Sequence, residues 1–344
     1  KLVRTEDAVG QVLCHDITQI IPGVVKDAVF RKGHIVTKED IPVLLSVGKE
    51  NLYIWEKQEG MLHENEAAEI LRQICQGEHM HPSEVKEGKI ELIADCEGVL
   101  KINTEKLNAV NNLGEMMIAS RHGNFPVKTG DKIAGTRIIP LVIEEEKMQK
   151  ACEVAGKEPI FRILPYQKKK AGIVTTGSEV YYHRIEDKFT PVVIEKLKEC
   201  GVTEVKQIQC NDDHEMITEA IQTLIEDGSD LIVCTGGMSV DPDDRTPLAI
   251  KNACTEVVTY GAPVLPGAMF MLAYCEKEGR QIPVMGLPGC VMYAKRTIFD
   301  LVLPRIMCDE KLHEKDFRLL GQGGLCLSCP VCTFPNCGFG KGGY

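Results

Sequence analysis

The sequence predicts an α/β protein whose main domain is a parallel sheet with helices on both faces, preceded by mixed α+β domains. Two observations lead to this prediction. Between residues 168 and 308, short apolar segments of strand length alternate with segments of helix length, as expected for parallel strands joined by right-handed crossovers. One of these segments, Asp230 to Thr235, contains a continuous apolar run, which is typical of a strand buried on both faces.

The length of 344 residues predicts more than one domain. We expect an N-terminal α+β domain at 1–80, a small β-rich domain with its connector at 81–165, the α/β domain at 166–310, and a linker with a cysteine-rich tail at 311–344.

The composition, with 44% hydrophobic and 26% charged residues, is that of a globular protein. No stretch approaches the roughly 20 apolar residues that span a bilayer, and the N-terminal residues contain no apolar core of a signal peptide. The net charge of −10 comes without a long basic run, which argues against nucleic acid as a partner. We therefore expect a cytoplasmic protein that binds neither membranes nor nucleic acid.

The first half of the chain mixes strands and helices. The predicted strands are Gly10–Ile17, Leu52–Trp55, Lys89–Ile93, Gly98–Ile102 and Lys132–Ile143. The predicted helices are Lys38–Leu45, Glu64–Cys75 and a charged connector at 144–158. Pro42 suits the first turn of the first helix, and Gly77 is a stop signal for the second.

The second half alternates regularly. The predicted strands are Ala171–Thr175, Glu204–Cys210, Asp230–Thr235 and Ile282–Gly286. The predicted helices are Thr190–Cys200, Asp213–Asp227, Thr246–Ala253, Phe270–Lys277 and Val291–Ile306.

The segment after the buried strand carries the most specific functional signal. Gly236 and Gly237 allow a sharp turn and a close approach of a ligand to the main chain. Three carboxylates follow at 241–244, and Thr246-Pro247 supplies a helix N-cap and a first-turn proline. Open α/β sheets bind their ligands at this carboxyl end of the strands.

Three further loops leave strand ends of the same domain, at 175–179, 211–215 and 286–290. The last runs into a predicted helix whose N-terminal amides suit an anion. Simpler interpretations remain open: Asp212 with Glu215 fits a capping box, and the first loop fits a plain turn. The acids near the glycines also fit a solvated loop. The combination favours a ligand site, and clustered acids beside a phosphate-sized loop indicate a divalent cation.

In order and spacing, these motifs resemble the molybdopterin-binding domain shared by gephyrin, molybdopterin molybdenumtransferase and molybdopterin adenylyltransferase. The motifs are Thr175–Glu179, Asn211–Asp213, Thr235–Asp244, Pro263–Gly267 and Gly286–Gly289. The resemblance covers residues 168 to about 308. It implies binding of molybdopterin or adenylyl-molybdopterin with Mg²⁺, molybdate insertion or adenylyl-molybdopterin processing by a transferase, and a homodimer.

The resemblance also assigns roles to residues of this chain. The catalytic residues would be Asp244, Glu179 and Asp213, and Asp244 with Asp212 would bind Mg²⁺. The residues implied in molybdopterin binding are Thr175, Thr176, Gly177, Ser178, Gly236, Gly237, Met238, Ser239, Pro266, Gly267, Leu287, Pro288 and Gly289.

Three positions depart from the family pattern. Asn211 replaces an arginine, Ser178 replaces an aspartate, and Cys290 replaces an asparagine. The missing arginine and asparagine favour a second hypothesis, a non-catalytic pterin-binding carrier or a sensor of redox state or metal supply. A nucleotide-processing enzyme on the same fold is a third. Residues 1–80 resemble, more loosely, the small β-clip domains called SAF.

Four cysteines near the end of the chain form a separate motif. Cys326, Cys329, Cys332 and Cys337 lie within twelve positions, after the glycine-rich stretch 321–324, which resembles a flexible linker. Adjacent Cys-x-x-Cys steps can surround one metal centre. The spacing fits either a four-thiolate zinc site or an iron–sulfur cluster. A disordered or disulfide-prone tail is the alternative interpretation.

Overall fold

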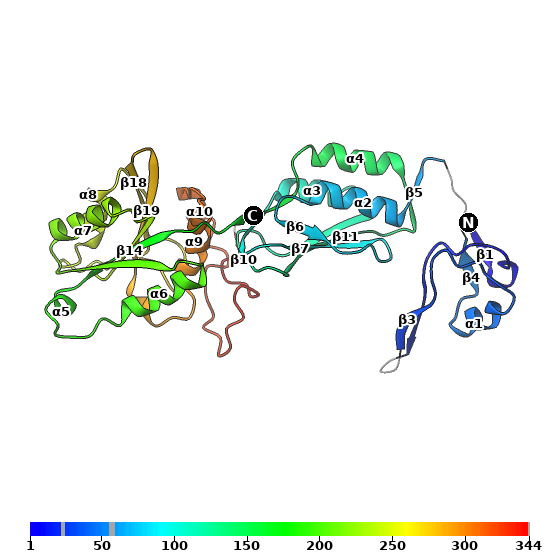
Figure 1. Ribbon diagram of the computed structural model, residues 1–344, viewed down its shortest axis with the longest axis horizontal. Helices are drawn as coiled ribbons and strands as arrows, with labels where there is room; N and C mark the ends of the chain where they lie inside the picture. Colours follow the sequence, from blue (N-terminus) through cyan, green and yellow to red (C-terminus); the bar gives the residue numbers. More distant parts are fainter. Residues whose placement is uncertain (22–24, 55–58, 343–344) are drawn as a thin grey trace. The chain divides into compact units, whose positions relative to one another are not determined.

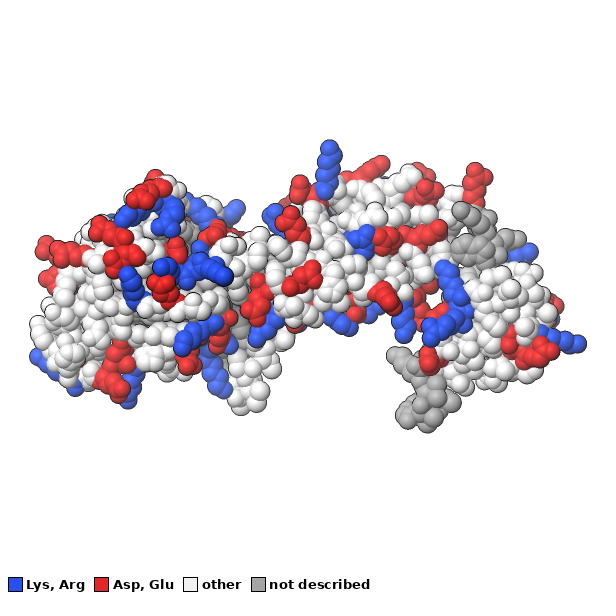
Figure 2. All heavy atoms as spheres, viewed as in Figure 1, with Lys and Arg blue, Asp and Glu red and all other residues white. Residues whose placement is uncertain are grey.

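The computed structural model describes residues 1–21, 25–54 and 59–342, which form two compact units (Figure 1). The first unit comprises residues 1–93, 103–121 and 132–161, and the second comprises residues 94–102, 122–131 and 162–344. On the face seen in Figure 2, acidic and basic side chains are interspersed over both units. None of the helices in the described ranges is long and apolar enough to cross a bilayer.

The first unit consists of small antiparallel sheets and short helices. Its pairs are β1 (Leu2–Arg4) with β4 (Asn51–Tyr53), β2 (Ile17–Ile21) with β3 (Val25–Phe30), and β5 (Met61–His63) with β12 (Val142–Glu144). A four-stranded sheet has the order β6 (Met80–Pro82), β7 (Lys89–Ala94), β11 (Lys132–Ile138), β9 (Met116–Ser120). The helices are α1 (Asp40–Ser46), α2 (Glu64–Cys75), α3 (Thr104–Asn111) and α4 (Glu145–Ala155), with a 3-10 turn at Thr5–Asp7.

Most predicted elements of this unit are present. Helix α2 has the predicted bounds, because Glu66 and His63 form a capping box at its start. The predicted strand at 10–17 is wrong: Val12 and Leu13 form only isolated bridges, and β2 begins at Ile17. The predicted strand at 132–143 is two strands, β11 and β12, in different sheets. Trp55, the predicted end of another strand, lies outside the described residues.

The second unit is built around a six-stranded sheet. Its order is β15 (Glu204–Cys210), β14 (Lys170–Thr176), β16 (Leu231–Thr235), β19 (Arg280–Leu287), β18 (Met271–Lys277), β17 (Glu256–Tyr260). The first four strands are parallel, and the last two join them antiparallel. Helices α6 (Phe189–Glu199) and α9 (Ile298–Met307) bury apolar side chains on one face, and α7 (His214–Glu226) and α8 (Thr246–Ala253) do so on the other. The predicted α/β architecture is confirmed.

Strand β18 overturns one prediction, that of a helix at 270–277. Glu278 and Gly279 have positive φ angles of 52° and 76° and form a two-residue turn, which folds β18 back onto β19. The four residues 272–275 are buried, as in a strand covered on both faces. A short apolar run of this kind does not distinguish a buried strand from a buried helix. The neighbouring edge strand β17 was not predicted.

Helix α9 starts later than predicted. After β19 the chain forms a 3-10 turn at Gly289–Met292, and α9 begins only at Ile298. The Thr297 side chain accepts the Phe299 N–H at 3.2 Å, and Asp300 accepts the Thr297 N–H at 2.7 Å. This capping box determines the helix start.

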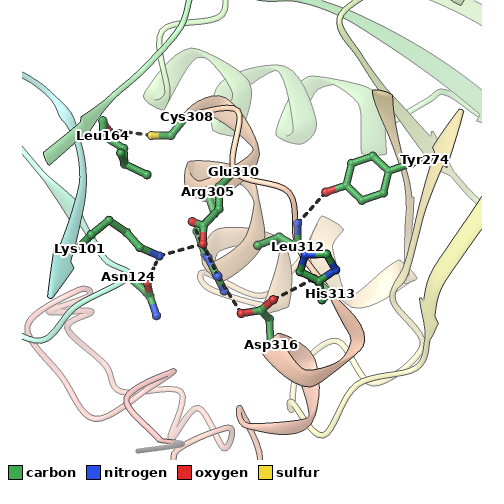
Figure 3. Close-up of polar contacts among 10 residues, drawn as sticks. All are labelled: Lys101, Asn124, Leu164, Tyr274, Arg305, Cys308, Glu310, Leu312, His313 and Asp316. Carbon is green, nitrogen blue, oxygen red and sulfur yellow. Dashed lines mark hydrogen bonds and ion pairs between the residues drawn. The ribbon is translucent and has the colours of Figure 1, made fainter. Parts of the chain in front are cut away.

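A smaller sheet and a polar network complete the second unit. The sheet has the order β10 (Pro126–Val127), β8 (Gly98–Ile102), β13 (Phe161–Pro165). Lys101 of β8 forms an ion pair with Glu310 at 2.8 Å, and Arg305 of α9 binds both Glu310 and Asp316 (Figure 3). Asp316 lies in the short helix α10 (Glu314–Arg318). This network ties β8 to the end of α9.

The tail forms no helix or strand over residues 319–342, yet it packs on the rest of the second unit. Phe339 is buried in the core that contains α9, and Phe334, Cys326 and Cys337 pack against it. The predicted flexible linker is hydrogen-bonded: Gly324 O accepts the Leu265 N–H, and Gly323 O accepts the Gly340 N–H.

Candidate functional site

The candidate site lies where the parallel strands of the second unit end. In the sheet register, Thr176 is opposite Cys210, and Thr235 lies between Thr175 and Leu287. The loops that follow β14, β15, β16 and β19 therefore leave from one edge, as the sequence predicted. We call the loop at 236–245 the glycine loop.

Three threonines connect the glycine loop to the end of β14. Thr176 donates its hydroxyl hydrogen to Thr235 O at 3.1 Å, and its oxygen lies 3.1 Å from that of Thr246. Gly236 and Gly237 have φ angles of 87° and 57°, where side chains are strained. A Cβ atom on Gly237 would lie 2.7 Å from the Thr246 hydroxyl oxygen. Only glycine therefore fits this turn against the strand end.

Asp244 closes the glycine loop. Its Oδ2 accepts the Ser239 N–H at 2.7 Å, and its own N–H donates to Asp241 O at 2.9 Å. The Tyr260 hydroxyl donates to Met238 O at 3.2 Å. Burial, together with the charge of Asp244, raises the pKa of Tyr260, so this phenol keeps its proton. The structure thus places a carboxylate and a phenol at the same loop.

Met238 holds the loop through its side chain, which is buried in the core under α7 and α8. Of the residues implied in molybdopterin binding, Met238 can therefore present only its backbone to a ligand.

The two acids after β15 have separate partners. Asp212 Oδ2 accepts the Ser178 N–H at 2.8 Å and connects this loop to the one after β14. Asp213 caps α7 by accepting the N–H groups of Glu215 and Met216, which lower its pKa. The sequence offered a capping box here, formed by Asp212 and Glu215. The cap is Asp213, one residue later, because the helix begins at His214.

Glu179 and Ser178 begin a single helical turn, α5 (Ser178–Tyr181). Gly177, with a φ of 129°, lets the chain turn from β14 into it. Glu179 is exposed beside this turn.

Two predictions at helix starts are wrong. Thr246 is the first residue of α8 and not its N-cap: that position is Arg245, which makes no capping bond. Gly289 is the first residue of a 3-10 turn and not of the predicted long α-helix, which begins only at Ile298. Pro266 O instead accepts the Ile298 N–H at 3.2 Å, and a Cβ atom on Gly267 would collide with Ile298. Pro266 and Gly267 therefore pack against the start of α9.

Sequence reasoning missed a polar cluster beside Thr175. The Thr175 and Thr190 hydroxyl oxygens are 2.8 Å apart, and Gln207 Nε2 donates to Thr175 Oγ1 and to Asp187 Oδ2, each at 2.9 Å. Burial alone would raise the pKa of Asp187, but hydrogen bonds from Thr190 and other donors hold it below its usual value. Gln207, a polar residue in the edge strand β15, was the available signal.

Thr235 was predicted as the end of the buried strand, but the sequence assigned it no role in binding. Its side chain is fully buried, and its hydroxyl oxygen has no hydrogen-bond partner within the described chain. Buried hydroxyls are normally paired. This one lies at the strand end from which the glycine loop starts.

The candidate ligands for Mg²⁺ are the carboxylates of Asp244 and Asp212. In the part of the chain that the structure describes, no three His, Cys, Asp or Glu residues are grouped to hold a metal ion. Asp244 and Asp212 each use Oδ2 for a backbone N–H. Mg²⁺ in phosphate sites commonly binds one or two carboxylates plus ligand phosphates, and both residues offer this type of donor.

Comparisons with known proteins identify two segments. A family described as a probable molybdopterin binding domain matches residues 172–307, and a domain of unknown function (DUF8806) matches residues 2–56. The first match confirms the resemblance of residues 168–308.

The relatives match only part of this chain. A CinA-like protein from Mycobacterium sp. (strain MCS) is 35% identical over 85 residues, which is 25% of this chain and 20% of that protein. The chain therefore spans about a fifth of the length of the curated relatives it matches. Among solved structures, the tungsten cofactor synthesizing protein MoaB from Pyrococcus furiosus is 23% identical, with a TM-score of 0.32 over 36% of this chain and 84% of that one. The molybdopterin biosynthesis Mog protein from Mycobacterium ulcerans is 19% identical, with a TM-score of 0.32 over 40% of this chain and 92% of that one.

Proposed function

We propose, from the membership of residues 172–307 in the molybdopterin-binding domain family, that this chain binds molybdopterin or its adenylylated form at the edge of its sheet. The observation that carries the proposal is the glycine loop. The loop is held against Thr176 and closed by Asp244. Because Gly236 and Gly237 carry no side chains, a ligand can approach their main chain at the end of a buried strand. Such loops bind phosphate groups through backbone N–H donors.

In this proposal the residues of the site position the ligand. The backbone at Gly236 and Gly237, with the Ser239 hydroxyl, faces its phosphate, and the buried Thr235 hydroxyl gains the partner that the described chain does not provide. Asp244 and Asp212 hold Mg²⁺, which when bound neutralises the phosphate oxygens. The reaction is molybdate insertion or processing of adenylyl-molybdopterin, and its rate rests on positioning and electrostatics.

One observation favours the second candidate, a binding protein without catalysis. Each of three carboxylates at the site has a structural partner: Asp213 caps α7, Asp212 binds the Ser178 N–H, and Asp244 binds the Ser239 N–H. Carboxylates engaged in this way explain the local fold without any reaction.

Equilibrium binding of molybdopterin to the full chain, under anoxic conditions with Mg²⁺, tests the proposal. We expect saturable binding that weakens about tenfold or more in Asp244→Ala, because the loop loses both its closing hydrogen bond and a charge. Asp244→Asn keeps an acceptor for the Ser239 N–H but not the charge, so the difference between the two variants isolates the electrostatic part. Asp243→Asn is the matched control, since Asp243 is the adjacent exposed acid.

Absence of binding by a folded sample would refute the proposal. Turnover with molybdate, or with ATP, would exclude the binding-only function. Saturable binding without either turnover would favour it.

A further inference from the structure

We propose that the tail binds an iron–sulfur cluster through Cys326, Cys329, Cys332 and Cys337. All four cysteines line a single cavity of about 500 Å³. The cavity also borders Pro266, Tyr293, Lys295 and Arg296, which belong to the α/β domain. The tail and the domain therefore build one site together, and this site goes beyond the proposed molybdopterin binding.

Backbone hydrogen bonds hold the start of the tail in place. Leu265 N donates to Gly324 O, and Cys326 N donates to Leu265 O, each at 2.8 Å. Cys326 and Cys337 pack against the domain core, whereas Cys329 and Cys332 are exposed. The site thus has two ligands anchored on the core and two on the loop between them.

The spacing Cys326-x2-Cys329-x2-Cys332, which resembles a ferredoxin-type cluster run, favours a cluster over a single ion. One tetrahedral zinc ion requires its four sulfur atoms at about 2.3 Å from a common point. Across the described residues, no three possible ligands already form a group that could hold a metal ion, so the four cysteines around the cavity would close on the cluster as it binds. A cluster fills such a cavity because each thiolate binds a different iron atom.

The charge around the cavity suits a cluster with thiolate ligands. Each cysteine loses its thiol proton when it binds iron, so four negative charges enter the site. Lys295 and Arg296 line the cavity, and Lys295 Nζ donates to Pro330 O at 2.8 Å. Lys295 thereby holds the loop that carries Cys329 and Cys332 and places a positive charge beside it.

Anaerobic reconstitution of the full chain with ferric iron, sulfide and a dithiol that reduces half of the iron, followed by desalting, tests the proposal. We expect about four iron and four sulfide per chain, with the visible absorption of sulfide-to-iron charge transfer. Cys329→Ser and Cys332→Ser should each lower the retained iron by at least about half, because thiolate is the ligand that such clusters require. These two positions are exposed, so the variants should fold even if Cys326→Ser or Cys337→Ser does not. Cys152→Ser, which removes an exposed thiol of α4, is the matched control and should retain the cluster.

Three results would overturn the proposal. They are stoichiometric zinc uptake with no retained sulfide, no retained iron in the folded chain, and equal iron in the Cys329→Ser variant and the wild type. None of them depends on molybdopterin, so failure here is distinct from failure of the proposed function.

Discussion

Replacing Asp300 should destabilise the second unit strongly, because this buried carboxylate has three partners. Its Oδ1 lies 2.6 Å from Lys196 Nζ and 2.8 Å from Arg296 Nη1, and its Oδ2 accepts the Thr297 N–H at 2.7 Å. The Asp300 and Lys196 side chains are only 3% and 9% exposed. The carboxylate therefore stabilises both the start of α9 and a buried cation.

The expected loss in the free energy of unfolding follows from the groups that lose their partner. In Asp300→Ala, Lys196 keeps the Lys295 carbonyl at 3.2 Å but no anion, and α9 loses its capping box. Removing one partner of a buried ion pair typically costs about 3–5 kcal/mol. Glu199→Gln is the matched control: its pair with Arg296 has a 55% exposed carboxylate, and such pairs contribute less than about 1 kcal/mol.

Native-state hydrogen exchange of peptides from α9 measures this effect within the second unit. The single tryptophan, Trp55, lies in the sequence range of the first unit, so its fluorescence would not report on α9. If Asp300→Ala lowered the free energy of unfolding by less than about 1 kcal/mol, as in the Glu199→Gln control, the result would refute the reasoning. A double replacement, Lys196→Met with Asp300→Leu, should recover part of the loss because no buried charge is left unpaired.

Two further predictions concern the glycine loop and the polar network. Gly236→Ala should lower the free energy of unfolding by about 1–3 kcal/mol. The reason is that the φ of 87° at this position strains a side chain, and the new Cβ atom would collide with the Thr176 carbonyl. Denaturant unfolding measures this loss, and an unchanged midpoint would contradict the prediction. At Glu310, burial alone would raise the pKa, but hydrogen bonds and charge from Arg305, with Lys101, hold it below its usual value. The stability that Glu310 contributes is therefore present above the unfolded pKa of about 4.3 and is lost as the pH falls through the lower folded pKa. Melting temperatures should then differ between wild type and Glu310→Gln at neutral pH and converge once the pH falls below the folded pKa of Glu310; a constant difference would contradict this assignment.

The site shows where local reasoning was sufficient. The glycine loop was predicted because its signal is contained in a few consecutive residues: an apolar strand, two glycines that turn the chain, and a proline in the first turn of a helix. The role of Asp213 as the N-cap of α7 was not predicted. Capping depends on which residue begins the helix, and element boundaries are the least reliable part of a sequence prediction. The partners of Thr175 lie 15 and 32 positions away, so no local pattern reveals them.

The sequence by itself determined the alternation of strands and helices in the second unit, the edge where its loops meet, and the cysteine motif. These features depend on periodicity and turn residues, which act over a few positions. Only the tertiary structure decided that residues 271–277 form a strand, since their pairing with β19 selects between two buried conformations. It also decided that the tail docks beside Leu265 and surrounds a cavity. Those outcomes depend on hydrogen bonds and packing between distant segments, whose free energy exceeds the small differences in local preference.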